Sequence, residues 1–187
     1  IRFMTNDFPY IPSELVNEQL EKALHGDSTK LTSTLLNNIE SLDEHSIPIL
    51  VQLLDTAPRK RKPLLYKSVR KIPTKLLVQH ADQFEKHVKA DFIQTCRTIL
   101  EADEEALWET YIDLVDELED GEGYSHQLYD MAKRVQTQLI EKGYYDAQKV
   151  ADILREELQE DYISYNGILA VRAVGIMQLT EHIEVLA

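Results

Sequence analysis

The starts of the expected helices keep a regular distance along the chain, and this spacing constrains the fold more than any other feature. Apolar residues recur at helical spacing almost throughout. The starts of alternate helices share a step of 30 residues: Ser13, Asp43, Pro73 and Asp103. Two further starts, near Tyr144 and Glu181, follow at steps of about 41 and 37 residues. A pair of short helices cannot bury both apolar faces alone, so neighbouring pairs are expected to stack and share a core.

Apolar positions also return after the same 30 residues. The matched pairs are Leu20 and Leu50, Leu24 and Leu54, Leu35 and Leu65, Ile39 and Val69, and Leu77 and Leu107. The chain has 6 Gly and 6 Pro in 187 residues, too few for an all-β fold with many tight turns. We therefore predict an all-α fold of stacked helix pairs, with a non-repeating helical bundle as the alternative.

Caps and breakers set the expected helix bounds. Polar capping residues precede the helices, and Gly or Pro ends several of them. The expected segments are 13–26, 27–39, 43–57, 64–72, 74–84, 88–100, 103–118, 125–143, 146–158, 162–179 and a last one from 183. The chain starts at Ile1 and stops at Ala187 inside an apolar helical pattern, which favours a piece of a longer protein.

The end of the chain carries a family resemblance. An apolar first helix, Val150 to Leu158, leads to a second helix, Gly167 to Leu179, that contains Arg172, Ala173 and Gly175. The stretch resembles a HEAT-like repeat over about 38 residues. Ile47 to Ile72 has a similar shape but lacks the usual Asp and Arg positions.

The resemblance implies a right-handed α-α superhelix of about five HEAT-like helix pairs. Residues 13–187 would form a single domain with a weak break at 121–124, after an N-terminal extension at 1–12. Arg172 would point inward or along the seam between repeats. The shared core would then include Leu169, Val174 and either Ile176 or Met177.

Charge and cysteine content limit the partners and the compartment. The chain has 33 acidic and 20 basic residues, a net charge of −13, which repels nucleic acid and anionic lipid. Its one cysteine, Cys96, fits a reducing compartment, so a cytoplasmic location is predicted. No apolar run is long enough to span a bilayer, and Ile1 to Tyr10 is unlike a signal peptide. Contact with a membrane is therefore not expected.

A basic segment interrupts this acidic chain. Between Arg59 and Lys75, 8 of the 20 basic residues occur in 17 positions without one acid: Arg59, Lys60, Arg61, Lys62, Lys67, Arg70, Lys71 and Lys75. Pro58 and Pro63 flank the tetrabasic run, which places it in a loop or a first helical turn. We predict that this segment contacts an anionic partner, and a solvated helix face is the alternative.

The region from Ala102 to Glu122 is the reverse, with ten acids and no basic residue. Five of its carboxylates follow helical spacing and share one face: Glu109, Asp113, Asp116, Glu117 and Asp120. We predict that this acidic face contacts a basic protein segment, again with a solvated face as the alternative. It has no loop of the calcium-binding type, so no metal is predicted.

No pattern predicts catalysis or a cofactor. The six histidines lack metal-ligand spacing, and no P-loop, Gly-x-Ser-x-Gly or dinucleotide-binding glycine pattern occurs. Cys96 lies on an apolar stripe, where a buried, unreactive thiol is expected. The chain is therefore not expected to be an enzyme.

Aromatic residues give a weaker signal. The tyrosines near the last full repeat would form a binding surface if exposed or ordinary core if buried, and the second is favoured: Tyr144, Tyr145, Tyr162 and Tyr165. Leu107 and Trp108 are adjacent, so one must leave the apolar stripe, and a partly exposed Trp108 would favour binding.

These features predict a non-enzymatic module for protein–protein interaction, a scaffold with separate basic and acidic patches. The alternative is a nucleic-acid binder similar to the HEAT-like DNA-repair glycosylases, which hold duplex DNA in a basic groove. One basic segment and a single Trp make nucleic acid the less favoured partner.

Overall fold

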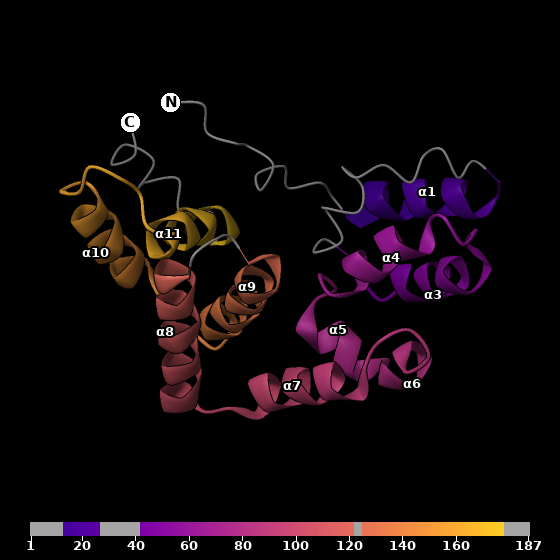
Figure 1. Cartoon of the computed structure of the whole chain (residues 1–187), viewed down its shortest axis with the longest axis horizontal. Coiled ribbons are helices and arrows are strands. Elements are labelled where there is room, and N and C mark those ends of the chain that lie inside the picture. The colour runs from indigo at the N-terminus through magenta and orange to yellow at the C-terminus, as the bar shows by residue number, and fades with distance from the viewer. Residues whose placement is uncertain (1–12, 27–41, 122–124, 178–187) are drawn as a thin grey trace. The chain divides into compact units, whose positions relative to one another are not determined.

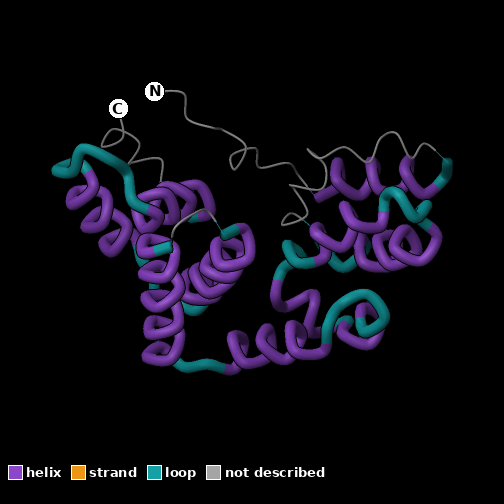
Figure 2. Tube along the Cα trace, in the orientation of Figure 1, coloured by secondary structure: helices purple, strands orange, loops and turns teal. Residues whose placement is uncertain are grey.

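The computed structural model describes residues 13–26, 42–121 and 125–177. Every regular element within these ranges is a helix, and they contain no strand (Figures 1 and 2). The prediction of an all-α fold is therefore confirmed. No described helix combines the length and the apolar character needed to cross a membrane. The expected helix at 27–39, the extension at 1–12 and the segment from 183 lie outside the described residues.

The chain divides into two compact units, Ile1–Leu100 and Glu101–Ala187. This division lies between Leu100 and Glu101, whereas the sequence suggested its weak break at 121–124. Helices on both sides of 121–124 pack against each other within the second unit. The prediction of one domain at 13–187 remains a prediction.

The first unit consists of short helices in the predicted order. They are α1 (Ser13–Leu24), α3 (Ser46–Thr56), α4 (Lys62–Val69), α5 (Thr74–Gln79), α6 (Ala81–Phe84) and α7 (Ala90–Glu101). Gly26, with φ of 115°, follows α1, and a left-handed backbone of this kind favours glycine. The expected single helix at 74–84 is broken at His80 into α5 and α6. The apolar period continues through His80, so the pattern gave no sign of this break.

Asp43 joins the start of α3 to α1. One of its carboxylate oxygens accepts hydrogen bonds from the backbone N–H groups of His45 (3.0 Å) and Ser46 (3.2 Å), which holds the turn before α3, while the helix begins at Ser46 and not at the expected Asp43. Asn17 of α1 donates its side-chain amide to the same carboxylate at 3.1 Å. The contact joins the second turn of α1 to the segment before α3, while apolar residues of both helices share the core.

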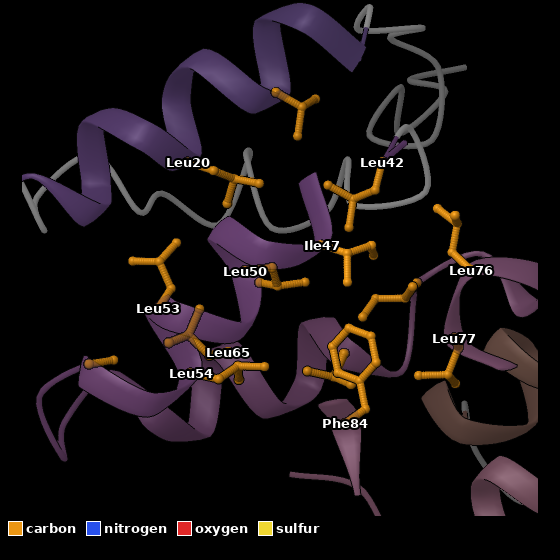
Figure 3. Packing of buried hydrophobic residues seen from close by; sticks show 14 of the residues in the cluster. Leu20, Leu42, Ile47, Leu50, Leu53, Leu54, Leu65, Leu76, Leu77 and Phe84 are labelled. Atoms are coloured by element: carbon orange, nitrogen blue, oxygen red, sulfur yellow. The ribbon is translucent and has the colours of Figure 1, made fainter. Parts of the chain in front are cut away.

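The described helices of the first unit share an apolar core. Figure 3 shows Leu20 of α1, Leu50 and Leu54 of α3, Leu65 of α4 and Phe84 of α6 among its side chains. Leu20, Leu50 and Phe84 are completely buried. Leu20 and Leu50, which match across the 30-residue step, therefore lie in the same interior, whereas Leu77 and Leu107 belong to different units.

Within its described residues, the second unit contains four helices whose starts are all capped by side chains. They are α8 (Glu104–Asp120), α9 (His126–Glu141), α10 (Ala147–Glu157) and α11 (Tyr165–Ile176). The caps accept a hydrogen bond from the backbone N–H three residues on: Asp103 at 3.0 Å, Ser125 at 3.4 Å, Asp146 at 2.9 Å and Ser164 at 3.0 Å. The first three were predicted. Ser164 starts α11 later than the expected Tyr162.

A polar bridge joins α9 to α11. Arg172 donates to Gln136 Oε1 at 2.8 Å and to Thr137 Oγ1 at 3.0 Å, and Gln136 Nε2 donates to the carbonyl of Leu169 at 2.7 Å. Arg172 thus lies along a helix–helix seam, as predicted. Gln136 is completely buried, so its amide needs both partners.

The core residues predicted for α11 are largely confirmed. Leu169 is completely buried and Val174 is buried. Of the two alternatives at the end of the helix, Ile176 is exposed and Met177 is half-buried. Ile176 is exposed because α11 ends there, so Met177 is the residue of this pair that is partly buried.

Candidate functional site

A pocket of about 430 Å³ opens on the second unit between α8, α10 and α11. From α8 come Trp108, Tyr111, Ile112, Val115 and Asp116. From α10 and α11 come Lys149, Asp152, Ile153, Glu156 and Asn166. On α8 and α10 the lining residues recur at three- and four-residue spacing, so each helix presents one face to the pocket.

Trp108 forms an aromatic wall held in a fixed orientation. Its ring stacks on that of Tyr145, with centroids 5.5 Å apart and planes 18° from parallel. Tyr111 meets the Trp108 ring edge-on at 5.7 Å and 86°. Both tyrosines are buried whereas Trp108 is half-buried, so two core residues support a ring that solvent still reaches.

The hydroxyl of Tyr111 fixes this wall to α11. It donates a hydrogen bond to Asn166 Oδ1 at 3.1 Å. Burial, with the neighbouring Tyr145 adding to it, raises the pKa of Tyr111 far above its ordinary value. The group therefore stays protonated as a donor throughout the physiological range, and Asn166 keeps its carbonyl oxygen toward Tyr111.

Carboxylates dominate the charge of the pocket. Asp116, Asp152 and Glu156 line it together with one cation, Lys149. Arg155 and Gln148 donate to Asp152 at 2.9 and 2.8 Å, so part of its charge is compensated. The ammonium of Lys149 lies 5.1 Å from the Trp108 ring centroid, above the ring. The pocket thus combines an aromatic wall, exposed aliphatic surface from Ile112 and an excess of negative charge.

The predicted acidic face of α8 flanks this pocket. Its five carboxylates are all exposed: Glu109, Asp113, Asp116, Glu117 and Asp120. On the other side of the helix, Leu107, Tyr111, Val115 and Leu118 are buried, and Leu114, which shares their apolar spacing, is half-buried. Asp116 belongs to both the acidic face and the pocket, so the two surfaces are continuous.

The predicted basic segment belongs to the first unit. Arg59 and Lys60 are exposed in the turn before α4, and the backbone N–H of Arg61 donates to the carbonyl of Pro58 at 2.8 Å. Lys62 is the first residue of α4, and Arg70 follows that helix. Arg61, Arg70 and Lys71 interact with other groups of the chain. The side chain of Lys67 lies outside the described part. Arg59, Lys60, Arg70 and Lys75 are the exposed cations among the described side chains of the segment.

Changing Arg59, Lys60, Arg61 and Lys62 together to Ser tests this basic segment. At low salt, binding of a short labelled glutamate–serine peptide is expected to weaken by about tenfold, because four attractive charges each contribute a few tenths of a kcal/mol. Fluorescence anisotropy across a salt series measures the effect. The matched control replaces four basic residues elsewhere in the same unit by Ser: Lys22, Lys86, Lys89 and Arg97. If the control variant loses as much affinity for the peptide, the basic segment is only a solvated face.

The remaining sequence candidates are placed as follows. Cys96 is completely buried, as expected. Of the tyrosines, Tyr145 is buried in the core, Tyr144 and Tyr165 are half-buried, and Tyr162 is 71% exposed. The four residues therefore belong neither to one exposed surface nor to one core. In the described ranges no three His, Cys, Asp or Glu side chains are grouped to hold a metal ion.

Sequence reasoning missed half of the pocket. Trp108 was singled out and Asp116 was predicted, but Lys149, Asp152, Glu156 and Asn166 were not. The i, i+3 and i+7 spacing of Lys149, Asp152 and Glu156 on α10 was a detectable signal for a shared polar face, whereas Asn166 lies on α11. The proximity of α10 to Trp108 required the tertiary structure.

Comparison with protein-family models, with curated proteins and with solved structures finds no match to this chain.

Proposed function

We propose that this chain is a non-enzymatic protein-binding module whose pocket beside Trp108 binds a basic segment of another protein. The observation that carries the proposal is the composition of the pocket: one supported aromatic ring with Asp116, Asp152 and Glu156 around it. Aromatic residues next to aliphatic surface are typical of protein-binding positions, and carboxylates select a cationic partner. The acidic face of α8 extends this negative surface beyond the pocket.

The proposed scaffold is a right-handed superhelix of HEAT-like helix pairs. Support comes from the 30-residue step, the burial of matched positions such as Leu20 and Leu50, and Arg172 on the seam between α9 and α11. Such arrays expose extended surfaces suited to polypeptide partners. We also propose a cytoplasmic location, because the chain has one cysteine.

Nucleic acid is the less favoured partner. Phosphate backbones are bound by Lys and Arg, and carboxylates beside an aromatic ring repel them. The carboxylates Asp116 and Glu156 lie in the same pocket as Trp108. The basic segment near Arg59 is accordingly assigned to an acidic segment of a protein.

A short labelled peptide of alternating basic and serine residues tests the proposal. Trp108 is the only tryptophan of the chain, so its fluorescence reports on the pocket directly. Binding should change this fluorescence and weaken as salt rises. The triple variant Asp116→Asn, Asp152→Asn, Glu156→Gln should weaken binding by about tenfold, because three carboxylates close to one ligand each contribute up to ~1 kcal/mol.

The matched control removes three exposed carboxylates of the same unit that do not line the pocket. It combines Glu141→Gln, Glu160→Gln and Asp161→Asn, which changes the net charge equally. Its binding should stay within about twofold of the wild type, a shift that general charge alone explains. Equal loss in both triple variants, or binding without a change in Trp108 fluorescence, would place the site elsewhere.

A further inference from the structure

A lysine of the chain itself lies in the pocket, where a basic side chain of a partner is expected to bind. Lys149 holds its ammonium 5.1 Å from the Trp108 ring centroid, and it lines the same pocket as Asp116 and Glu156. A cation over an aromatic face is the arrangement that an incoming basic side chain would adopt. In the unbound protein, Lys149 therefore occupies the position over Trp108 that a partner's basic side chain would take.

The position of Lys149 in its helix is unfavourable for a positive charge. It lies in the first turn of α10, where its backbone N–H donates to the capping Asp146 at 2.9 Å. The amino end of a helix carries partial positive charge, so a cation there is destabilising and a carboxylate is preferred. α10 has no acidic residue in its first turn. Helix stability thus does not explain a lysine at this position, whereas the contact with Trp108 does.

We infer, building on the proposed function, that the pocket binds an arginine side chain of the partner and that Lys149 is displaced from Trp108 when it binds. Arginine fits better than lysine because its planar guanidinium stacks on an aromatic ring. Its fork of N–H donors also meets a carboxylate through two parallel hydrogen bonds, for which Asp116 and Glu156 are available in the pocket. Lysine is a compact, strongly hydrated charge and gains less from both contacts.

Displacement makes Lys149 an intramolecular competitor. A tethered side chain acts at a high effective concentration, so the affinity for the partner's arginine is lower than the bare pocket would give. Removing the ammonium frees the ring and also removes a repelling charge. The variant Lys149→Gln should therefore bind an arginine peptide about threefold to tenfold more tightly than the wild type. Lys149→Arg keeps the competitor and should bind no more tightly than the wild type.

Three peptides of one length isolate the ligand chemistry. They alternate serine with arginine, with lysine, or with citrulline, which has nearly the shape of arginine without its charge. Anisotropy of the labelled peptide gives the affinity, and Trp108 fluorescence gives the place of binding. The order of affinity should be arginine, lysine, citrulline, with about twofold to fivefold between the first two. Trp108→Phe, which keeps a smaller ring, should reduce this difference.

The control for charge is Lys86→Gln, an equal change at an exposed lysine of the first unit that does not line the pocket. It should leave the arginine-peptide affinity within about twofold of the wild type. Tighter binding in Lys149→Gln but not in Lys86→Gln supports displacement. If the arginine peptide alters Trp108 fluorescence but Lys149→Gln binds no more tightly, or if the lysine peptide binds equally well, this inference is overturned while the proposed function stands. If no basic peptide affects Trp108, both are wrong.

Discussion

Replacing Leu169 by alanine is expected to lower the free energy of unfolding by about 2 to 5 kcal/mol. The side chain is completely buried in α11, a helix that packs against α8, α9 and α10. Truncation loses the transfer free energy of the removed carbons and leaves a cavity that the surrounding helices fill only partly. The backbone carbonyl of Leu169 also accepts the Gln136 amide, so relaxation around the cavity disturbs the polar bridge.

Urea unfolding followed by Trp108 fluorescence measures this effect, because the single tryptophan lies in the same unit as Leu169. The matched control is Leu158→Ala, the same chemical change at a leucine that is 64% exposed after α10. Its effect should stay within about 0.5 kcal/mol. If both variants unfold at the same urea concentration as the wild type, Leu169 is not part of the core.

Replacing Phe84 by alanine is expected to cost about 3 to 5 kcal/mol in the first unit. Phe84 ends the four-residue helix α6 and is completely buried. Figure 3 places its ring in the interior with Leu65 and Leu77. A helix this short gains almost nothing from its own hydrogen bonds, so packing of its aromatic side chain must fix it in place.

Circular dichroism during urea unfolding is the appropriate measurement, because Trp108 belongs to the other unit. Phe92 offers a matched control, since it is half-buried at the margin of the same core. Phe92→Ala should cost clearly less than Phe84→Ala, because less surface leaves contact. If Phe92→Ala lowers the free energy of unfolding more than Phe84→Ala does, Phe84 is not at the centre of the core.

The two proposed contacts use the charge of the chain differently. The basic segment around Arg59 and Lys60 is a local exception in a protein of net charge −13, so its attraction for an anionic partner works against the overall field. The pocket beside Trp108 works with that field, because its carboxylates and the acidic face of α8 have the sign of the whole chain. A basic partner is therefore attracted at long range as well as in the pocket.

Much of the fold follows from the sequence alone. Helical periodicity predicts the helices, and Asp103, Ser125 and Asp146 predict where three of them begin, because a capping side chain acts on backbone groups three residues away. The same local rule places Glu109, Asp113 and Glu117 on the exposed side of α8, opposite the buried Leu107 and Tyr111. Such features depend on neighbours within one or two helical turns, so the linear pattern contains them.

The break at His80 and the pocket depended on the tertiary structure. His80 lies inside an uninterrupted apolar period, so the linear pattern does not predict the break between α5 and α6, and Phe84 at the end of α6 is buried in the core. Trp108 stood out in the sequence as a residue beside the apolar stripe. Tyr145, between α9 and α10, supports its ring, and Lys149 of α10 lies over it, so both contacts depend on how these segments pack against α8. Contacts between residues about forty positions apart arise from helix packing, and no periodicity within one helix encodes them.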